Sequence, residues 1–496
     1  MTSEDEVLVA MSIADDDYIV DSAAGDARTG DAPAKSGAFA RQQAMPRGEG
    51  GGGGACCGPG PGPPPSGPGP AGPAVLAGRT TGAGRRPRGR DPLSAAEVAA
   101  ACTAVRERHP GLNFVEVELH EGSSAGASSS GRRRAHVLTY DRRTNTTTSH
   151  VVAVGAGAGT GAAAAVEESV SHGEGQVQPA IDGEEYEAVE RLLKRHPPFV
   201  AAMRARGVED VEGRVAVDLW CQGWFSEADS PKKRLGKPLI FLKGGPGGNP
   251  YSCPVEGLEV LIDLAKMEIV EFVDLERRPL PRPDAYSDFD GVTETAEHAA
   301  AGLCRPLKPL VFQQAEGPSF SVDGYNVEWW RWKFSVGWTP REGLVLHDVS
   351  VGDVDRGLRR QVAQRISFVE MVVPYGDPRE PHCRKNAFDA GEDGLGKNAN
   401  SLRLNCDCLG HIWYFDAHQS TWNGGVETIE QAICMHEEDQ GLLWKHQDWR
   451  TGGQTHSKRA RRLEVSFICT IANYDYRFSI SFKVSMHATA PGGAED

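Results

Sequence analysis

RLEVSFICTIANYDYRFSISF, residues 462–482, alternates apolar and polar side chains along most of its length. Such a period of two is typical of a β-strand that places one face on a hydrophobic core. The apolar positions are Leu463, Val465, Phe467, Cys469 and Ile471, followed by Tyr474, Tyr476, Phe478, Ile480 and Phe482. The parity changes between Ile471 and Tyr474. This change predicts either a strand buried on both faces or a β-bulge near Ala472 and Asn473.

The sequence around this stretch is rich in strand-like runs from about residue 305 onward. The runs are SFSVDGYNVEWWRWKFSV (319–336), GLVLHDVSV (343–351), RISFVEMVVPY (365–375) and HIWYFDA (411–417). Asp323-Gly324 lies between two of them and predicts a type I′ hairpin. So many strands predict a β-sandwich over residues 305–482.

Two smaller units are predicted before the sandwich. In residues 91–172, Ser94 and Glu97 form a capping-box pattern at the start of a helix, and strand-like runs follow. In residues 176–290, Asp182 and Glu185 repeat the capping pattern, a second short helix follows, and strands come next. The predicted fold class is therefore α+β, with two small α+β domains followed by the sandwich.

Composition limits the remaining part of the chain and its partners. Residues 1–90 include a Gly/Pro-rich segment without large apolar side chains, which predicts a disordered, low-complexity tail. The net charge of −15 argues against nucleic acid as a partner. There is no apolar run long enough to span a membrane, and the acidic start MTSEDEVLVA does not resemble a signal peptide.

An acidic, glycine-containing stretch is the first candidate for chemistry. AFDAGEDGLG, residues 387–396, lacks the pattern of a phosphate-binding loop and of a calcium-binding EF-hand loop. One interpretation is a solvated acidic turn. The other is that Asp389, which follows Phe388, lies in a partly apolar pocket where burial makes a carboxylate a usable base near neutral pH.

Cysteines and histidines between residues 406 and 436 form the second candidate. The residues are Cys406, Cys408, His411, His418 and His436. A zinc site is one interpretation, but a Cys-x-Cys pair without a second pair is poor zinc-ligand spacing. A disulfide between one cysteine of this pair and Cys434 is the simpler interpretation.

Six blocks in order resemble the copper-containing amine oxidases. The blocks are QAEGPSFSVDG (314–324), VPYGDP (373–378), AFDAGEDGLG (387–396), ANSLRLNCDCLG (399–410), ICMHEEDQGLLWKH (433–446) and TIANYDY (470–476). The resemblance covers about residues 91–482. It implies that the two small units correspond to the family's N2 and N3 domains, and that residues 483–496 lie outside the family pattern.

The resemblance implies a chemistry for two residues. Tyr474 matches the tyrosine that copper and O₂ convert to topaquinone, which forms a Schiff base with a primary amine. Asp389 matches the proton acceptor that removes a proton from the adjacent carbon. The implied products are an aldehyde, ammonia and hydrogen peroxide, and the implied assembly is a homodimer.

The resemblance also implies roles for further residues. Tyr375 matches a tyrosine that hydrogen-bonds the cofactor, and Asn473 matches a residue beside the cofactor ring. Ala387 occupies a position where relatives often carry a gate aromatic, so we expect an open entrance there. Cys408 and Cys434 match a family disulfide.

The copper ligands are the point at which the sequence departs from the family. The family uses a His-x-His pair and a third histidine after the tyrosine, whereas this sequence has only His487 after Tyr474 and no His-x-His. We therefore expect no metal ligands in this chain. The positions of the family's copper histidines are expected to fall beyond Asp496, so that the sandwich is truncated at its C-terminal end.

Two hypotheses about the chain as a whole stay open. One is an amine oxidase of which this sequence is a shortened version, and the other is a non-catalytic fragment. An intracellular location, peroxisomal or cytoplasmic, is the expectation.

Overall fold

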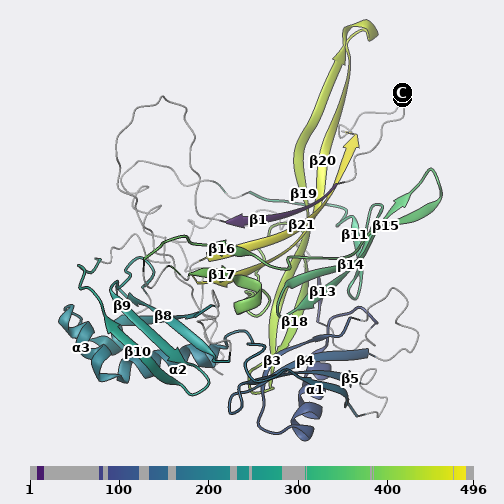
Figure 1. Ribbon diagram of the computed structural model, residues 1–496. Coiled ribbons are helices and arrows are strands. Elements are labelled where there is room, and N and C mark those ends of the chain that lie inside the picture. Colours follow the sequence, from purple (N-terminus) through teal and green to yellow (C-terminus); the bar gives the residue numbers. More distant parts are fainter. Residues whose placement is uncertain are drawn as a thin grey trace, which may run out of the picture.

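Figure 1 shows the computed structural model, in which a long two-stranded arm rises from a sandwich and two smaller units lie below it. The structure describes residues 8–15, 78–81, 88–121, 133–154, 163–223, 232–244, 248–281, 308, 310–379, 383, 385–472 and 474–487. Within these residues no helix is both long and apolar enough to cross a membrane. The predicted α+β class, with small mixed domains and a strand-rich larger one, is confirmed.

The sandwich is built from two sheets that face each other. One sheet has the strand order β11-β12-β13-β14-β15, and the other has the order β1-β21-β20-β19-β18-β2. The first sheet contains β11 (Phe320–Asp323), β12 (Asn326–Trp329), β13 (Trp332–Thr339), β14 (Gly343–Asp353) and β15 (Leu358–Ser367). The second contains β1 (Leu8–Asp15), β2 (Gly78–Thr80), β18 (Trp413–Ser420), β19 (Val426–Asp448), β20 (Gln454–Ile471) and β21 (Tyr474–His487).

Aromatic side chains from both sheets fill the space between them. Phe482 stacks on Phe334 with ring centroids 4.5 Å apart, and it meets the edge of Trp332 at 5.0 Å. Phe467 stacks on Phe478 at 5.2 Å, and both are fully buried. Because each large ring removes much apolar area from water, this cluster contributes strongly to the hydrophobic stabilisation of the sandwich.

The parity change in residues 462–482 comes from a hairpin, and the predicted bulge is wrong. Ile471 of β20 pairs with Tyr474 of β21, so a two-residue turn joins the strands. Ala472 in this turn has φ 59°, in the left-handed region that such tight turns use. Because residues paired across an antiparallel ladder point to the same face, both apolar series line one core.

The predicted hairpin near Asp323-Gly324 is also present, but its turn differs from the expected type. Asp323 pairs with Asn326, so the loop residues are Gly324 and Tyr325. Gly324 has φ 67°, whereas Tyr325 is absent from the residues with positive φ. A glycine with positive φ at only the first loop position fits a type II′ turn rather than type I′.

The first small unit packs helix α1 (Ala95–Arg108) on one sheet of four strands. The strands are β3 (Asn113–Leu119), β4 (Arg133–Asp141), β5 (Thr146–Val154) and β6 (Ala165–Ser171), paired in that order. The predicted capping box is present, with Ser94 and Glu97 exchanging hydrogen bonds. Glu97 also binds Arg133 of β4 at 2.7 Å, and both side chains are buried.

The second small unit repeats this arrangement with different elements. It contains α2 (Gly183–Arg195), α3 (Pro197–Ala205), α4 (Val211–Arg214), β7 (Val215–Cys221), β8 (Leu235–Leu242), β9 (Leu258–Asp263) and β10 (Glu268–Asp274). Asp182 and Glu185 form the predicted capping box. Glu185 binds Arg234 at 2.6 Å, again with both side chains buried. In each unit the capping glutamate therefore joins the helix start to a buried arginine, Arg133 in β4 and Arg234 directly before β8.

Two ends of the chain differ from the expected boundaries. β1 pairs with β21 and β2 pairs with β18, so residues 1–90 contain two strands of the sandwich where we expected a tail without structure. Arg79 of β2 contributes to this pairing through an ion pair with the buried Asp416 at 2.8 Å. At the other end, β21 continues to His487, past the expected boundary at residue 482.

Glu116 of β3 gives the small domain a predicted pH dependence. Its Oε1 is closed off from solvent and has no hydrogen-bond partner among the described residues, and burial followed by the charge of Glu118 raises its pKa to about 7. Because the folded protein holds this proton more tightly than the unfolded chain does, the contribution of Glu116 to stability is most favourable below the pKa that the carboxyl has in the unfolded chain. This contribution is lost as the pH rises through about 7. We therefore expect Glu116→Gln to stabilise the protein by roughly 1–2 kcal/mol near pH 8 and to change little near pH 5. Urea unfolding at both pH values measures this; a variant with equal effects at both would contradict the assignment.

Candidate active site

Asp389 begins a single turn of π-helix, η3 (Asp389–Asp393), directly after the short strand β17 (Asn386–Phe388). Its side chain is 3 % exposed. Its backbone N–H donates to Met371 O at 3.2 Å, and its carbonyl accepts from Gly394 N–H at 3.0 Å. π-helical turns are rare and often occur at functional sites. The interpretation of this stretch as a solvated acidic turn is wrong for Asp389.

The acids around Asp389 hold the turn in place. Glu370 accepts hydrogen bonds from Ala390 N–H at 2.9 Å and from Gly391 N–H at 3.1 Å. Glu392 accepts from Phe388 N–H at 3.1 Å. Asp393, which is buried, accepts from Tyr186 Oη–H of α2 at 2.7 Å. The turn is therefore fixed both to its own domain and to the second small unit.

Glu370→Ala tests whether this carboxylate holds the turn. Removing the acceptor leaves three backbone N–H groups, those of Met371, Ala390 and Gly391, without this partner, as when a helix loses its N-terminal cap. We expect a loss of about 1–2 kcal/mol of stability and faster amide exchange at Ala390 and Gly391. Hydrogen exchange read by mass spectrometry measures it, and unchanged exchange in peptides covering residues 387–396 would contradict it. Glu430→Ala is the control, because its exposed carboxylate pairs with Arg79 instead of with this turn.

The hairpin that carries Tyr474 lies next to this turn. Burial, followed by the charges of Asp389 and Asp475, raises the pKa of the Cys469 thiol well above its usual value. Cys469 of β20 pairs with Tyr476, and the Tyr476 ring stacks on the Tyr474 ring with centroids 5.6 Å apart. Asp389 and Tyr474 are thus related indirectly, through the charge of Asp389 acting on Cys469, the pairing of Cys469 with Tyr476, and the stacking of Tyr476 on Tyr474.

Residues 398–400 fix the end of this hairpin on its other side. Asn400 N–H donates to Ile468 O at 2.8 Å, and Thr470 N–H donates to Asn398 O at 3.2 Å. The Asn400 side chain then donates to Thr470 Oγ1 at 2.9 Å, and Thr470 Oγ1–H donates to Asp475 at 2.6 Å. This chain of hydrogen bonds, which the sequence alone did not reveal, explains why a threonine and an acid flank the tyrosine. Asn473 lies outside the described residues.

Tyr375 lies at the far end of the ribbon that carries Asp389. β16 (Val372–Pro374) pairs with β17, and Tyr375 N–H donates to Lys385 O. Lys385 is four residues from Asp389, and four residues of extended strand span roughly 13 Å. The Tyr375 ring packs against Trp220 of β7, with centroids 5.6 Å apart, and Lys385 Nζ lies 4.4 Å from the centroid of the Tyr375 ring. The implied contact of Tyr375 with the cofactor stays a prediction.

Ala387 does not open an entrance as expected. It is 3 % exposed and packs in a small cluster with Trp220, Leu239 and Phe241 of the second small unit. A cavity of about 260 Å³ lies on another side of the turn. Gly391 and Glu392 line it together with Arg234 and with Ile181, so it adjoins the turn of Asp389.

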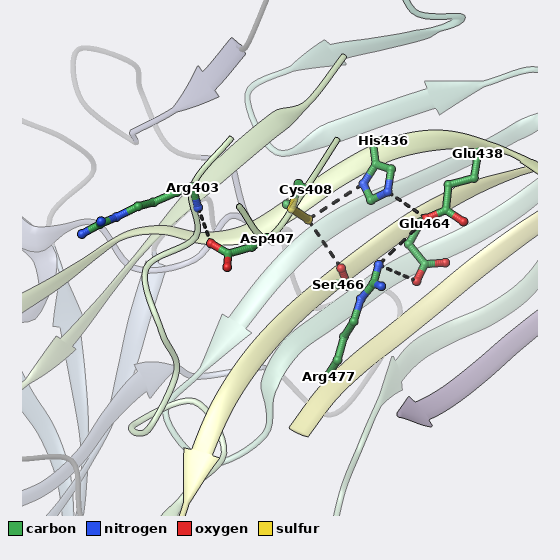
Figure 2. The surroundings of a disulfide bond; sticks show 9 residues. Arg403, Asp407, Cys408, His436, Glu438, Glu464, Ser466 and Arg477 are labelled. Carbon is green, nitrogen blue, oxygen red and sulfur yellow. Dashed lines mark hydrogen bonds and ion pairs between the residues drawn. A yellow bond between two sulfur atoms is a disulfide. The ribbon is translucent and has the colours of Figure 1, made fainter. Parts of the chain in front are cut away.

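Cys408 and Cys434 form a disulfide, as the resemblance implied. His436 lies beside it: His436 Nδ1 is 3.9 Å from Cys434 Sγ, and its Nε2 is 2.9 Å from Glu438 Oε1 (Figure 2). This hydrogen bond is the main cause that lowers the pKa of Glu438 to about 2.

The described residues do not provide a copper site of the implied kind. Among them, the group of three metal-binding side chains with ligand atoms close together is Cys408, Cys434 and His436. It has one imidazole instead of three, and its two sulfur atoms are bonded to each other. Because imidazole is the ligand that suits Cu(II), this group does not fit the family's copper centre.

The expected place of the copper histidines, beyond Asp496, stays a prediction. The described residues end at His487, so Asp496 and the segment before it lie outside them. What the structure does describe is β21 up to His487, a strand that continues the sandwich past the expected boundary at residue 482.

Comparison with known proteins assigns the two largest units. The family model described as "Copper amine oxidase, enzyme domain" matches residues 321–489, and "Copper amine oxidase, N3 domain" matches residues 184–290. We had placed residues 483–496 outside the family pattern, but the first match includes residues 483–489. That boundary is therefore wrong for residues 483–489.

Individual relatives agree with these assignments. A peroxisomal copper-containing diamine oxidase of Nicotiana tabacum is 46% identical over 78% of this chain and 53% of its own length. A primary amine oxidase of Arthrobacter is 38% identical over 78% of this chain and 57% of its own length. The crystal structure of a copper-containing benzylamine oxidase from Hansenula polymorpha superposes with a TM-score of 0.66 at 29% identity, covering 80% of this chain and 62% of that one. This chain thus spans about half the length of its curated relatives, and it belongs to the copper amine oxidase family.

Proposed function

We propose that this chain carries the amine-reacting part of a primary amine oxidase. In this reaction a primary amine, O₂ and water give an aldehyde, ammonia and hydrogen peroxide. The observation that supports it is that Asp389 is buried and that its charge acts on Cys469, whose pairing partner Tyr476 stacks on Tyr474. The acid and the tyrosine that the family resemblance singles out are 85 positions apart in sequence (474 minus 389), and these indirect contacts support the proposal that they belong to one site.

Asp389 has the features of a general base in this proposal. A carboxylate that is removed from water, on a turn fixed by four backbone and side-chain contacts, keeps one orientation toward a bound substrate. It would take the proton from the carbon that bears the amine. A quinone derived from Tyr474 would supply the electrophilic carbonyl and accept the electrons when it is formed.

A second candidate is a non-catalytic protein that keeps the family fold. The specific observation in its favour is the absence, among the described residues, of a three-histidine cluster. The same observation is why we derive no step through copper. The two candidates differ in whether Tyr474 is ever converted to the quinone.

Titration with phenylhydrazine separates the two candidates. The full chain would be incubated aerobically with Cu²⁺, freed of loose metal, and titrated while the absorbance of the hydrazone is followed. One hydrazone per chain, absent from Tyr474→Phe, supports the oxidase. No hydrazone in either protein would reject the oxidase for this chain and support the non-catalytic candidate.

The location and assembly are further parts of the proposal. Relatives from Nicotiana tabacum and Pichia angusta are named as peroxisomal, so we propose a peroxisomal location, which a fluorescent fusion beside a peroxisomal marker tests. The arm of β19 and β20 exposes Leu442, Leu443 and Trp449, with Trp449 81% exposed. This apolar surface supports a homodimer. Light scattering of the purified protein would show twice the chain mass.

A further inference from the structure

The disulfide between Cys408 and Cys434 lies in a cluster that is arranged like a metal site. Cys434 and His436 are on the same face of β19, and Cys408 approaches them from a loop (Figure 2). The two Sγ atoms and one nitrogen of His436 all lie within 4.8 Å of one another, and the three residues are buried. Clusters of exposed acidic side chains are common on protein surfaces without a metal. This group differs from them because all three of its residues are buried and none is an acid.

His436 is oriented as metal-binding histidines are. Its Nε2 lies 2.9 Å from Glu438 Oε1, which favours the tautomer with the proton on Nε2 and the lone pair on Nδ1. That lone pair is on the side of Cys434 Sγ, 3.9 Å away. Glu438 is itself held by Arg462 at 2.7 Å. A carboxylate behind a histidine is the common outer contact that fixes the ring of a metal ligand.

We propose that reduction of the Cys408–Cys434 disulfide turns this cluster into a binding site for a thiophilic d¹⁰ cation, Zn²⁺ or Cu⁺. A dithiol reductant supplies two electrons and two protons, so the disulfide becomes two thiols. Binding of the cation then releases both protons as Cys408 and Cys434 coordinate as thiolates with His436 Nδ1. Hydrogen peroxide reverses the change: two thiolates, two protons and one peroxide give the disulfide and two waters, and the cation leaves.

The distances suit such a cation with small movements. Zinc–sulfur bonds of about 2.3 Å and zinc–nitrogen bonds of about 2.0–2.1 Å in a tetrahedron place neighbouring ligand atoms roughly 3.5–3.8 Å apart. The separation of Cys434 Sγ from His436 Nδ1 is already close to this value. Ser466 Oγ, 3.5 Å from Cys434 Sγ, borders the fourth position.

The loop that carries Cys408 provides the access and the freedom that the site requires. Cys408 is 3 % exposed, but its neighbours Cys406, Asp407 and Leu409 are exposed. Cys434 is instead fixed in the ladder opposite Ser466. Cleavage of the disulfide thus frees one ligand on a surface loop while two ligands stay in place on a strand. Two thiolates and one imidazole select soft cations, which separates this site from the family's copper centre.

Cobalt titration of the full chain tests the proposal. The protein would be titrated anaerobically with Co²⁺ in its disulfide form and after reduction and removal of the reductant. We expect one Co²⁺ per reduced chain with thiolate-to-cobalt charge-transfer absorption, displaced by one Zn²⁺, and no such absorption in the disulfide form. Titration with Cu⁺ against a competing chelator then decides which d¹⁰ cation binds more tightly.

Variants distinguish this site from other metal-binding groups. His436→Gln keeps both cysteines and should form the disulfide normally but lose the stoichiometric Co²⁺ site, and Glu438→Gln should weaken it about 10–100-fold. Cys406→Ser and His446→Asn are matched controls, because Cys406 is an exposed cysteine outside the triad and His446 faces His456 across the exposed arm. The proposal is overturned if the reduced protein binds no stoichiometric Co²⁺, or if His436→Gln binds it as the parent does.

Discussion

Replacing Arg234 with methionine is expected to destabilise the second small unit by about 3–5 kcal/mol. Arg234 lies just before β8 and donates to both carboxylate oxygens of Glu185, at 2.8 and 2.6 Å. The side chains of the two residues are 4% and 0% exposed. Methionine fills much of the same volume but leaves the Glu185 charge buried without its main partner, and this is why the loss is large.

The arginine also satisfies backbone groups that methionine cannot reach. Its guanidinium donates to Pro179 O at 2.8 Å and to Ala180 O at 3.0 Å. Glu185 keeps its capping contact with Asp182 N–H at 3.2 Å, so the helix start is weakened rather than removed. Hydrogen exchange over α2 and β8 is the measurement, since a chain of several domains need not unfold in one step.

Two comparisons make the Arg234 result specific. The double variant Arg234→Met/Glu185→Leu removes both charges and should recover most of the loss. Arg191→Met removes a partner of Glu187, but that pair is 55% and 38% exposed, so it should cost at most about 0.5 kcal/mol. Equal exchange in Arg234→Met and the parent would mean that the buried pair contributes little.

The sequence predicted best those local features that depend on residues only a few positions apart, such as the caps of helices. Both capping boxes, at Ser94 and Asp182, formed as predicted because the two side chains of each box are three residues apart and reach each other's backbone N–H through local geometry alone. The parity change at Ile471 was detected correctly but interpreted wrongly. A bulge and a two-residue turn both shift the alternation by one position, and only the pairing of β20 with β21 distinguishes them.

Contacts between distant segments could not be predicted in this way. The partner of Glu185 is 49 positions away and that of Asp393 is 207 positions away. Polar alternation along a strand says that a side chain is buried, but not which buried group it meets. The position of Tyr375 shows the same limit: its packing against Trp220, after the pairing of β16 with β17, joins segments that the sequence alone does not bring together, and its implied contact with the cofactor stays a prediction.

Asp389→Asn is the second prediction with a large expected effect, and it rests on the proposed oxidase activity. Asparagine keeps the shape and the buried position of Asp389 but cannot accept a proton from carbon. Loss of a positioned general base typically costs about 10²–10⁴-fold in rate. We expect a decrease of this size in the rate at which a primary amine reduces the protein under anaerobic conditions, with the phenylhydrazine titre unchanged.

An unchanged phenylhydrazine titre in Asp389→Asn shows that the variant has lost only its general base and still forms the quinone. Hydrazine attack needs no proton removal from carbon, so a protein that has formed its quinone should react in the variant as in the parent. Glu392→Gln is the matched control on the same turn: its side chain accepts from Phe388 N–H and lines the neighbouring cavity, and its replacement should change the rate less than about tenfold. If Asp389→Asn reacts with amine as fast as Glu392→Gln does, the base is another group. If both variants lose the hydrazine titre, the acids of the turn act by holding the hairpin of Tyr474 in place, and Asp389 would then be a structural residue.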